Sequence, residues 1–293
     1  MKTHLRKRAI LHADETTLQV LKEAGRAAQT ESYMWLYRSG RDGPPIVLFE
    51  YQPTRAAAHP TKFLKGFSGY LHVDGYVVYE SLSGVTLVGC LAHARRKFVE
   101  ALNTLPAATR KQGGTASHTG LAFCDALFKI ERDLHDVTPE ERFAARQERS
   151  LPVLRQFHVW LKSMEAQVLP KSLLGAAVTY CLNQWSKLNN FLLDGRLEID
   201  NNRAERAIRP FAIGRKNWLF SNTPGGARSS AVIYSLVETA KENGLNPLTY
   251  LTYLFEQLPN IDLKDPDALD RLLPWADAIQ AQFHIPVKSR PNA

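Results

Sequence analysis

The hydrophobic pattern of this chain changes its period once, at Cys90, and this change limits the fold more than any other feature. Before Cys90, short runs of β-branched and aromatic residues alternate with turn residues, which is typical of strands. The predicted strands are Arg8–Asp14, Tyr33–Tyr37, Ile46–Tyr51, Tyr70–Asp74 and Val85–Cys90. Helix-forming residues over Ala56–Phe67 predict a crossover between the third and fourth strands. We therefore expect an α/β fold with a sheet of mixed direction.

In the second part of the chain, apolar residues recur at helical spacing, most clearly over residues 121–193. Thr138-Pro139-Glu140-Glu141 has a capping residue, a proline and first-turn acids in the order of a helix start. The polar interval Lys111–Gly120 is the best candidate for a linker. Further along, Pro224-Gly225-Gly226 predicts a turn before a helix at Ala231–Glu242. The middle of the chain is therefore expected to be helical.

Composition and charge exclude several classes of protein. A chain of 293 residues that is 44% hydrophobic and 23% charged is neither disordered nor collagen-like. The longest uncharged apolar stretch, Ser172–Ser186, is shorter than the ~20 residues that span a bilayer, and the start lacks a signal-peptide core. Three widely spaced cysteines fit a reducing compartment. We expect a cytoplasmic protein, and its net charge of +8 favours nucleic acid as the partner.

Two aspartates stand at the ends of predicted strands. Asp14 ends the first predicted strand, and Asp74 ends the fourth. Because open α/β sheets bind ligands at strand ends, neighbouring strands would bring both carboxylates to one place. Each aspartate by itself is also a common turn residue.

A third acidic candidate, Glu205, lies in a short predicted helix that Asp200 caps and Pro210 limits. Ala204, Ala207 and Ile208 form its apolar stripe, which leaves Glu205 on a polar arc beside two arginines. The alternative is an ordinary exposed glutamate paired with Arg209, a contact that contributes ~0.3–0.5 kcal/mol.

Three acidic side chains at one place require a cation, and their oxygens suit Mg²⁺ or Mn²⁺. Two such ions about 3.5–4 Å apart stabilise the attacking and leaving oxygens of a phosphoryl displacement. Residues 196–228 hold seven basic and three acidic residues, so 7 − 3 = +4, half of the net charge, lies around Glu205. This combination favours metal-dependent phosphodiester chemistry on nucleic acid.

Several motifs occur in the same order as in the transposases of the bacterial IS66 insertion-sequence family, which this chain resembles. They are His12–Thr16, Val73–Tyr76, Cys90–Phe98, Asp200–Pro210, Gly214–Phe220, Asn243–Pro247 and Leu272–Trp275. The resemblance implies a ribonuclease-H-like core whose DDE catalytic and metal-binding triad falls on Asp14, Asp74 and Glu205. It also implies two Mg²⁺ ions, with Mn²⁺ as a substitute. The implied activity is cleavage at the ends of the element, followed by transfer of the 3′-hydroxyl to target DNA.

The same resemblance divides the chain into a core interrupted by a helical insertion. Residues 1–90 are expected to form the first part of the core, 91–195 the α-helical insertion, 196–258 the remainder of the core and 259–293 a C-terminal tail. The interval between Asp74 and Glu205, 205 − 74 = 131 residues, exceeds what one strand and one helix need, which agrees with an insertion.

The residues expected to contact DNA are basic or aromatic. They are Arg95, Arg96, Lys97, Arg203, Arg206, Arg209, Arg215, Lys216 and Trp218. A solvated helix face is the alternative for the first three. Trp218 is interpreted either as a core residue or as a platform for an unpaired base.

The expected partners are double-stranded DNA, as terminal inverted repeats and as target, and a second copy of the chain in the active complex. Accessory proteins of the same element are further possible partners, and no membrane is expected. The expected location is the cytoplasm, in association with the nucleoid. Full-length members of the family also carry an N-terminal portion with DNA-binding elements and a zinc-binding segment. Here the first motif begins within fourteen residues of Met1, so we expect a truncated or split copy.

Two alternative functions stay open at this point. The chain is alternatively a DNA-binding remnant that regulates transposition, or a structure-selective nuclease with a ribonuclease-H-like fold. Cys90 and His93 have a spacing that suits a metal, but no second pair stands at a matching interval, so a buried thiol is the simpler interpretation of Cys90.

Overall fold

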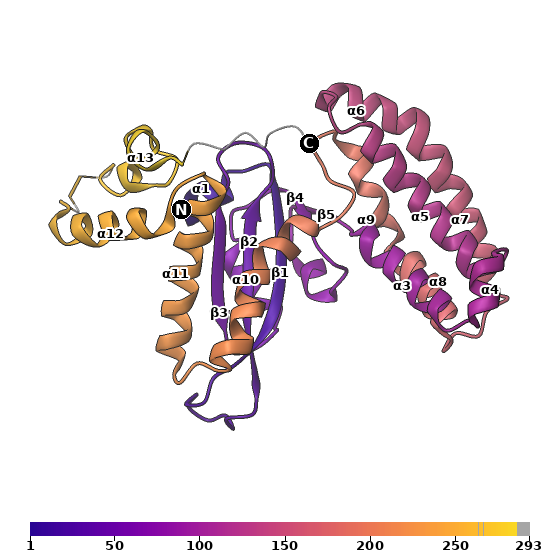
Figure 1. The fold of residues 1–293 in the computed structure, drawn as a ribbon, viewed down its shortest axis with the longest axis horizontal. Helices are drawn as coiled ribbons and strands as arrows, with labels where there is room; N and C mark the ends of the chain where they lie inside the picture. The colour runs from indigo at the N-terminus through magenta and orange to yellow at the C-terminus, as the bar shows by residue number, and fades with distance from the viewer. Residues whose placement is uncertain (263, 266, 286–293) are drawn as a thin grey trace. The chain divides into compact units, whose positions relative to one another are not determined.

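The computed structural model describes residues 1–262, 264–265 and 267–285, and it divides the chain into two compact units. Unit 1 comprises Met1–Phe67 and Arg203–Ala293, and unit 2 comprises Ser68–Asn202. In Figure 1, unit 1 holds the first strands and the last helices of the chain, and unit 2 holds the helices of its middle. The chain therefore completes unit 1 only after the whole of unit 2.

Three antiparallel strands of the sheet form the centre of unit 1. The strands are β1 (Ile10–Gln19), β2 (Glu31–Ser39) and β3 (Val47–Gln52). In their register Asp14 lies opposite Leu36, and Leu36 lies opposite Phe49. The helices of this unit are α1 (Lys2–Arg6), α2 (Ala58–Phe63), α10 (Asn202–Trp218), α11 (Pro224–Glu242), α12 (Pro247–Gln257) and α13 (Asp277–Phe283). Figure 1 shows α10 and α11 running along the sheet.

The two faces of this sheet are covered by different helices. Alternate side chains of each strand point to one face, and on that face Leu18, Met34, Leu36 and Phe49 pack against Ala204, Ala207, Ile208 and Phe211 of α10. On the other face Tyr37 stacks on Phe63 of α2, with ring centroids 3.8 Å apart. The apolar stripe that the sequence predicts for the Glu205 helix is confirmed, because all three of its residues are buried.

Helix α11 covers the outer edge of β3, the last strand of the sheet. The N–H of Val47 donates to the hydroxyl of Thr239 at 3.0 Å, and that hydroxyl donates to the carbonyl of Val47 at 2.9 Å. The hydroxyl of Ser235 accepts the N–H of Phe49 at 2.8 Å. The unpaired N–H and C=O groups of an edge strand can bind a strand of another chain. Here the side chains of α11 bind these groups instead, so this edge of β3 is protected.

Thr239→Val is expected to destabilise the protein by about 2 kcal/mol, because valine keeps the shape but leaves the N–H and C=O of Val47 buried without partners. Denaturant unfolding of the variant measures this loss. The matched control is Thr252→Val on α12, whose hydroxyl donates to Leu248 in an exposed position, and it should change stability by less than about 0.5 kcal/mol. Equal stability of the two variants would contradict this account of the β3 edge.

The last helices of unit 1 have a small core of their own. Ala240, Leu245, Tyr250, Leu254 and Ile279 are its buried members. The tail predicted for residues 259–293 includes residues 263, 266 and 286–293, which lie outside the described residues.

Unit 2 joins two parallel strands to a group of helices. The strands are β4 (Gly69–His72) and β5 (Val85–Val88), which pair from Gly69 opposite Val85 to His72 opposite Val88. The helices are α3 (Leu91–Asn103), α4 (Ala107–Gln112), α5 (Ala116–Asp133), α6 (Pro139–Ala145), α7 (Leu151–Glu165), α8 (Leu173–Asn183) and α9 (Trp185–Asn189), with a π-helical turn at Arg146–Ser150. Helix α3 packs on α5 and α8, and α7 packs on both of them (Figure 1). Rings of Phe98, Phe123, Phe157 and Trp160 fill the space between them.

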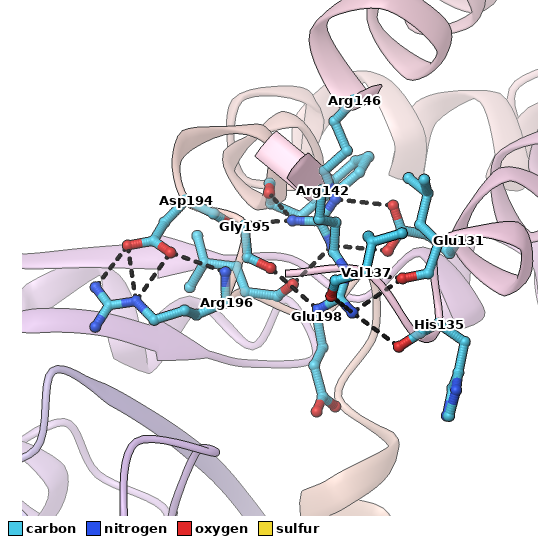
Figure 2. A network of polar contacts seen from close by, with 12 residues as sticks. Glu131, His135, Val137, Arg142, Arg146, Asp194, Gly195, Arg196 and Glu198 are labelled. Atoms are coloured by element: carbon cyan, nitrogen blue, oxygen red, sulfur yellow. Dashed lines mark hydrogen bonds and ion pairs between the residues drawn. The ribbon is translucent and has the colours of Figure 1, made fainter. Parts of the chain in front are cut away.

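A buried arginine ties the helices of unit 2 to the segment that follows them (Figure 2). Arg146 is 1% exposed, and its guanidinium donates two bonds to the carboxylate of Glu131, at 2.9 and 2.7 Å. Its other bonds reach the carbonyls of Phe191, Asp194 and Leu197, at 2.8, 3.0 and 2.8 Å. All five guanidinium N–H groups are therefore paired, and residues 191–197 are held against α5.

The sequence predicts the elements better than their ends. All five predicted strands are present, with antiparallel and parallel pairs, so the mixed α/β expectation is confirmed. The helix start at Thr138 is confirmed as a capping box. The predicted end of the first strand at Asp14 is wrong, because β1 continues to Gln19. Two further β-branched residues there extend its ladder with β2.

Three predicted interruptions are helical in the structure. Helix α10 continues through Pro210 to Trp218, because its packing on the sheet outweighs the missing N–H of the proline. Residues 224–226 form the first turn of α11, where Thr223 accepts the N–H of Gly226 and Pro224 takes the first helical position. The predicted linker 111–120 contains the end of α4 and the start of α5, and only residues 113–115 join them.

The predicted ribonuclease-H-like topology and the predicted divisions at residues 90, 195 and 258 stay predictions. Among the described helices, none combines the length and the apolarity that crossing a membrane requires.

Candidate functional site

Asp14 lies in the middle of β1, on the face of the unit 1 sheet that α10 covers. It stands four residues before Leu18 and opposite Leu36, and both leucines belong to the core beneath α10. Its side chain is half-buried, and its Oδ1 accepts the N–H of Glu15 at 2.8 Å. The extension of β1 beyond Asp14 therefore fixes which face of the sheet the carboxylate joins.

The start of α10 is held beside the first half of β1, close in register to Asp14. Arg38 of β2 is 2% exposed and lies opposite His12, two residues before Asp14. Its guanidinium donates to the carbonyl of Arg203 at 3.3 Å and to the carboxylate of Glu242, at 3.2 and 3.0 Å. The first turn of α10 is thereby attached to β2 at Arg38, whose partner on β1 lies two residues before Asp14.

Glu205 occupies that first turn. Its side chain is half-buried, at the border between the buried stripe of α10 and the exposed side chains of Arg206 and Arg209. Glu205 is therefore less exposed than the alternative interpretation expects, and its pairing with Arg209 stays an alternative. Asp14 and Glu205 thus lie on the same face of the unit 1 sheet, one on β1 and one on the helix that packs on it.

The far end of α10 is attached to β1 by Arg215. Its guanidinium donates to the hydroxyls of Thr16 and Thr17, at 3.2 and 2.9 Å, and to the carbonyl of Thr17. Arg215, which the sequence predicts as a DNA contact, is therefore engaged in holding the helix on the strand. Its contact with DNA stays a prediction.

Asp74 belongs to unit 2, two residues after the end of β4. The pairing with β5 continues past the strand, because the N–H of Val73 donates to the carbonyl of Val88 at 3.0 Å. The carboxylate of Asp74 is half-buried, and its Oδ1 accepts the N–H of Tyr76 at 2.9 Å, which closes a turn through Gly75 at φ +104°. The prediction that Asp74 joins Asp14 and Glu205 stays a prediction.

Tyr180 of α8 fixes this turn from the helical side. Its hydroxyl donates to the backbone carbonyl of Asp74 at 2.7 Å. Burial raises the pKa of Tyr180 well above its ordinary value, so the hydroxyl remains a donor at every physiological pH. The helices of unit 2 thus determine where the backbone of Asp74 lies.

The predicted basic residues of α3 have different surroundings. Arg95 donates to Asp125 at 2.6 Å, Lys97 lies 5.1 Å from the ring centroid of Tyr180, and Arg96 is exposed. A cavity of about 430 Å³ is lined by Ala92, Arg95, Arg96, Val99, Asp125, Phe128, Arg132 and Asn202. The sequence does not predict Arg132 of α5 as a member of this group. Helical spacing does not show which helix α5 packs against, and it is this packing that brings Arg132 close to Arg95.

The predicted basic residues of α10 are more accessible. Arg206, Arg209 and Lys216 are exposed, and Arg203 is half-buried. Trp218 is half-buried and packs edge-on against Phe211, with ring centroids 5.3 Å apart. The ring of Trp218 thus adds to the core beneath α10.

Cys90 precedes α3 as a buried thiol. It is fully buried, and its Sγ accepts the N–H of Asn201 at 3.2 Å. The N–H of Leu91 donates to the carbonyl of Ile199 at 3.0 Å, so the same turn is held by two bonds to one segment. The burial predicted for the Cys90 thiol is confirmed, and metal binding by Cys90 and His93 stays an open alternative.

Comparison with known proteins covers nearly the whole chain. The family model described as "Transposase IS66 family" matches residues 1–229, and the "IS66 C-terminal element" matches residues 235–275. Uncharacterized protein y4qI of Sinorhizobium fredii is 35% identical over 280 residues, 90% of this chain and 50% of that protein. Uncharacterized protein y4jD of the same strain is 32% identical over 285 residues, 92% of this chain and 54% of that protein.

The chain thus spans about half the length of the curated relatives it matches. No solved structure matches it. The motifs around Asp14, Asp74 and Glu205 all lie within the region that the first family model covers. This chain belongs to the IS66 family of transposases.

Proposed function

We propose that this chain carries the DDE active site of a transposase, with Asp14, Asp74 and Glu205 as the acidic triad. Family membership supports a role in transposition. The observation that carries the site assignment is the placement of Asp14 and Glu205 on one face of the unit 1 sheet, with both carboxylates half-buried. Arg38 and Arg215, which attach α10 to β2 and β1, act as positioning residues for Glu205.

The donor chemistry of the triad fits divalent metal ions. Three half-buried carboxylates offer hard oxygen ligands of the kind that Mg²⁺ and Mn²⁺ prefer. Two bound ions would supply charge stabilisation for the attacking and leaving oxygens of a phosphoryl displacement. Three carboxylates gathered at one place would repel one another, so ion binding and triad formation would favour each other.

The proposed substrate is double-stranded DNA, as the ends of the element and as its target. Arg206 and Arg209 project from α10 within about one turn of Glu205, and their exposed guanidinium groups suit bidentate contacts with phosphate. They would hold the backbone beside the triad. We propose that two copies of the chain act in one complex, in the cytoplasm, on the two ends of the element.

Removal of divalent ions is expected to abolish DNA cleavage while leaving DNA binding in place. The chain would be incubated with DNA that carries the ends of its own element, with Mg²⁺, with Mn²⁺ or with EDTA. Nicked 3′-hydroxyl ends are expected with either ion and are expected to be absent in EDTA. Band-shift assays in EDTA measure binding independently. Binding without nicking under any divalent ion would contradict the proposal and favour a DNA-binding remnant.

A further inference from the structure

The turn after α10 holds two large apolar side chains in solvent. Leu219 is 61% exposed and Phe220 is 43% exposed. Leu219 also has φ +63°, and among the residues that the structure describes it is the single non-glycine residue with positive φ. Leucine avoids this conformation, and such strain persists only where the surroundings enforce it, commonly at functional sites.

The surroundings of Leu219 enforce it. Its N–H donates to the carbonyl of Arg215 at 2.8 Å, and the N–H of Phe220 donates to the carbonyl of Trp218 at 2.8 Å. The N–H of Ser221 then donates to Gln19 of β1 at 2.9 Å, while the carbonyl of Ser221 accepts the N–H of Leu21 at 3.0 Å. These backbone bonds hold the turn in one conformation. In that conformation the side chains of Leu219 and Phe220 stay outside the core.

A stripe of exposed residues leads along α10 to this turn. Arg206, Arg209, Ile213 and Lys216 are exposed and follow one another at spacings of three, four and three residues, which places them on one face of the helix. Three of the four are cationic, and Glu205 is the single acidic residue on α10. The stripe suits a polyanion lying along the helix, and the apolar pair stands at its end.

We propose that Leu219 and Phe220 form an apolar wedge that enters between base pairs of DNA bound along α10. Apolar side chains on a basic surface kink and unwind duplex DNA in this way, since they replace part of the base stacking they disrupt. Glu205 and Trp218 are 218 − 205 = 13 residues apart, about 20 Å along the helix axis. At 3.4 Å per base pair, the distorted step lies about six base pairs from the phosphate at Glu205.

This inference rests on the proposed function for its substrate, but it concerns how the DNA is deformed. An exposed apolar pair such as Leu219 and Phe220 could also bind a second copy of the chain. The cationic stripe favours DNA, because a second copy of a chain with net charge +8 carries the same sign of charge.

The test measures DNA unwinding in EDTA, where no cleavage is expected. Closed circular plasmid DNA would be relaxed by a type IB topoisomerase in the presence of the full chain, and the change in linking number would be measured per bound protein. The wild-type chain is expected to unwind the plasmid. Leu219→Asn with Phe220→Ser should lose this effect and bind at least about fivefold more weakly, the loss expected for one stacked base. Asparagine tolerates positive φ, so the double variant keeps the backbone of the turn.

Two further variants separate the wedge from a structural role. Leu219→Gly is expected to relieve the backbone strain, and therefore to raise the melting temperature while it reduces unwinding. Leu248→Asn on α12, where the leucine is 74% exposed, is the matched control and should unwind the plasmid like the wild type.

The outcomes distinguish this inference from the proposed function. Cleavage of element ends by a chain that does not unwind the plasmid would overturn the wedge and leave the active-site proposal standing. Unwinding unchanged in the double variant would overturn the wedge as well. A double variant that loses self-association in sedimentation, but not unwinding, would assign the turn to a contact between copies instead.

Discussion

Asp14→Asn, Asp74→Asn and Glu205→Gln are each expected to reduce metal-dependent DNA cleavage more than about 100-fold, the loss already produced by changes to the partners of metal ligands. Each amide keeps the size of the side chain but removes the charge that binds the ion. DNA binding should be retained, because it depends on separate basic residues such as Arg206 and Arg209. Cleavage of a labelled element end and a band-shift assay measure the two properties side by side.

The matched control for this prediction is Glu15→Gln. Glu15 neighbours Asp14 on β1 but points to the opposite face, where its carboxylate pairs with Arg55. Only 2% of the Glu15 side chain is exposed, but its amide variant keeps an oxygen that accepts from Arg55. Cleavage per folded protein, with the folded fraction measured by circular dichroism, should therefore match the wild type. Unchanged cleavage by Asp74→Asn would remove Asp74 from the triad, and equal losses for Glu15→Gln and Asp14→Asn would show that the strand, rather than the carboxylate, accounts for the effect.

Arg146→Ala is expected to destabilise the protein by about 3–5 kcal/mol, the usual cost of breaking a buried ion pair. The substitution leaves Glu131 charged with 14% of its side chain exposed, and it removes the donor to the carbonyls of Phe191, Asp194 and Leu197. Unit 2 should unfold at lower denaturant concentration as a result. Denaturant melts followed by circular dichroism measure the change.

A second arginine provides the control. Arg149, three residues after Arg146, pairs with Asp133, and the side chains of Arg149 and Asp133 are both more than 40% exposed. Arg149→Ala should therefore change the free energy of unfolding by less than about 1 kcal/mol. If Arg146→Ala and Arg149→Ala had similar effects, the Arg146 network would not be the contact that organises residues 191–197.

The fold could be predicted from the sequence where local patterns decide it. The strand runs, the capping box at Thr138 and the apolar stripe of α10 follow from residue types at fixed spacings. The ends of elements depend on tertiary packing. Nothing local shows that α10 continues through Pro210, because the burial of Ile208 and Phe211 against the sheet supplies the stabilisation that the proline removes.

The candidate site shows the same limit. The sequence identifies Asp14 and Glu205 by their motifs, but the expected position of Asp14 at the end of a strand is wrong. The face that Asp14 occupies follows from its register with Leu36, and the attachment of α10 by Arg38 joins residues far apart in the chain. Arg132, which shares a cavity with Arg95, was missed for the same reason. Contacts between distant segments leave no periodic pattern in the sequence.

The most direct test of the proposed active site is the location of Mn²⁺ bound to the protein. Crystals of the full chain grown or soaked with Mn²⁺ would be examined by anomalous diffraction. The proposal predicts an anomalous peak about 2.1 Å from carboxylate oxygens of Asp14 and Glu205, with Asp74 as a further ligand in the assembled site. A Mn²⁺ ion bound elsewhere, with no peak at these carboxylates, would contradict the account.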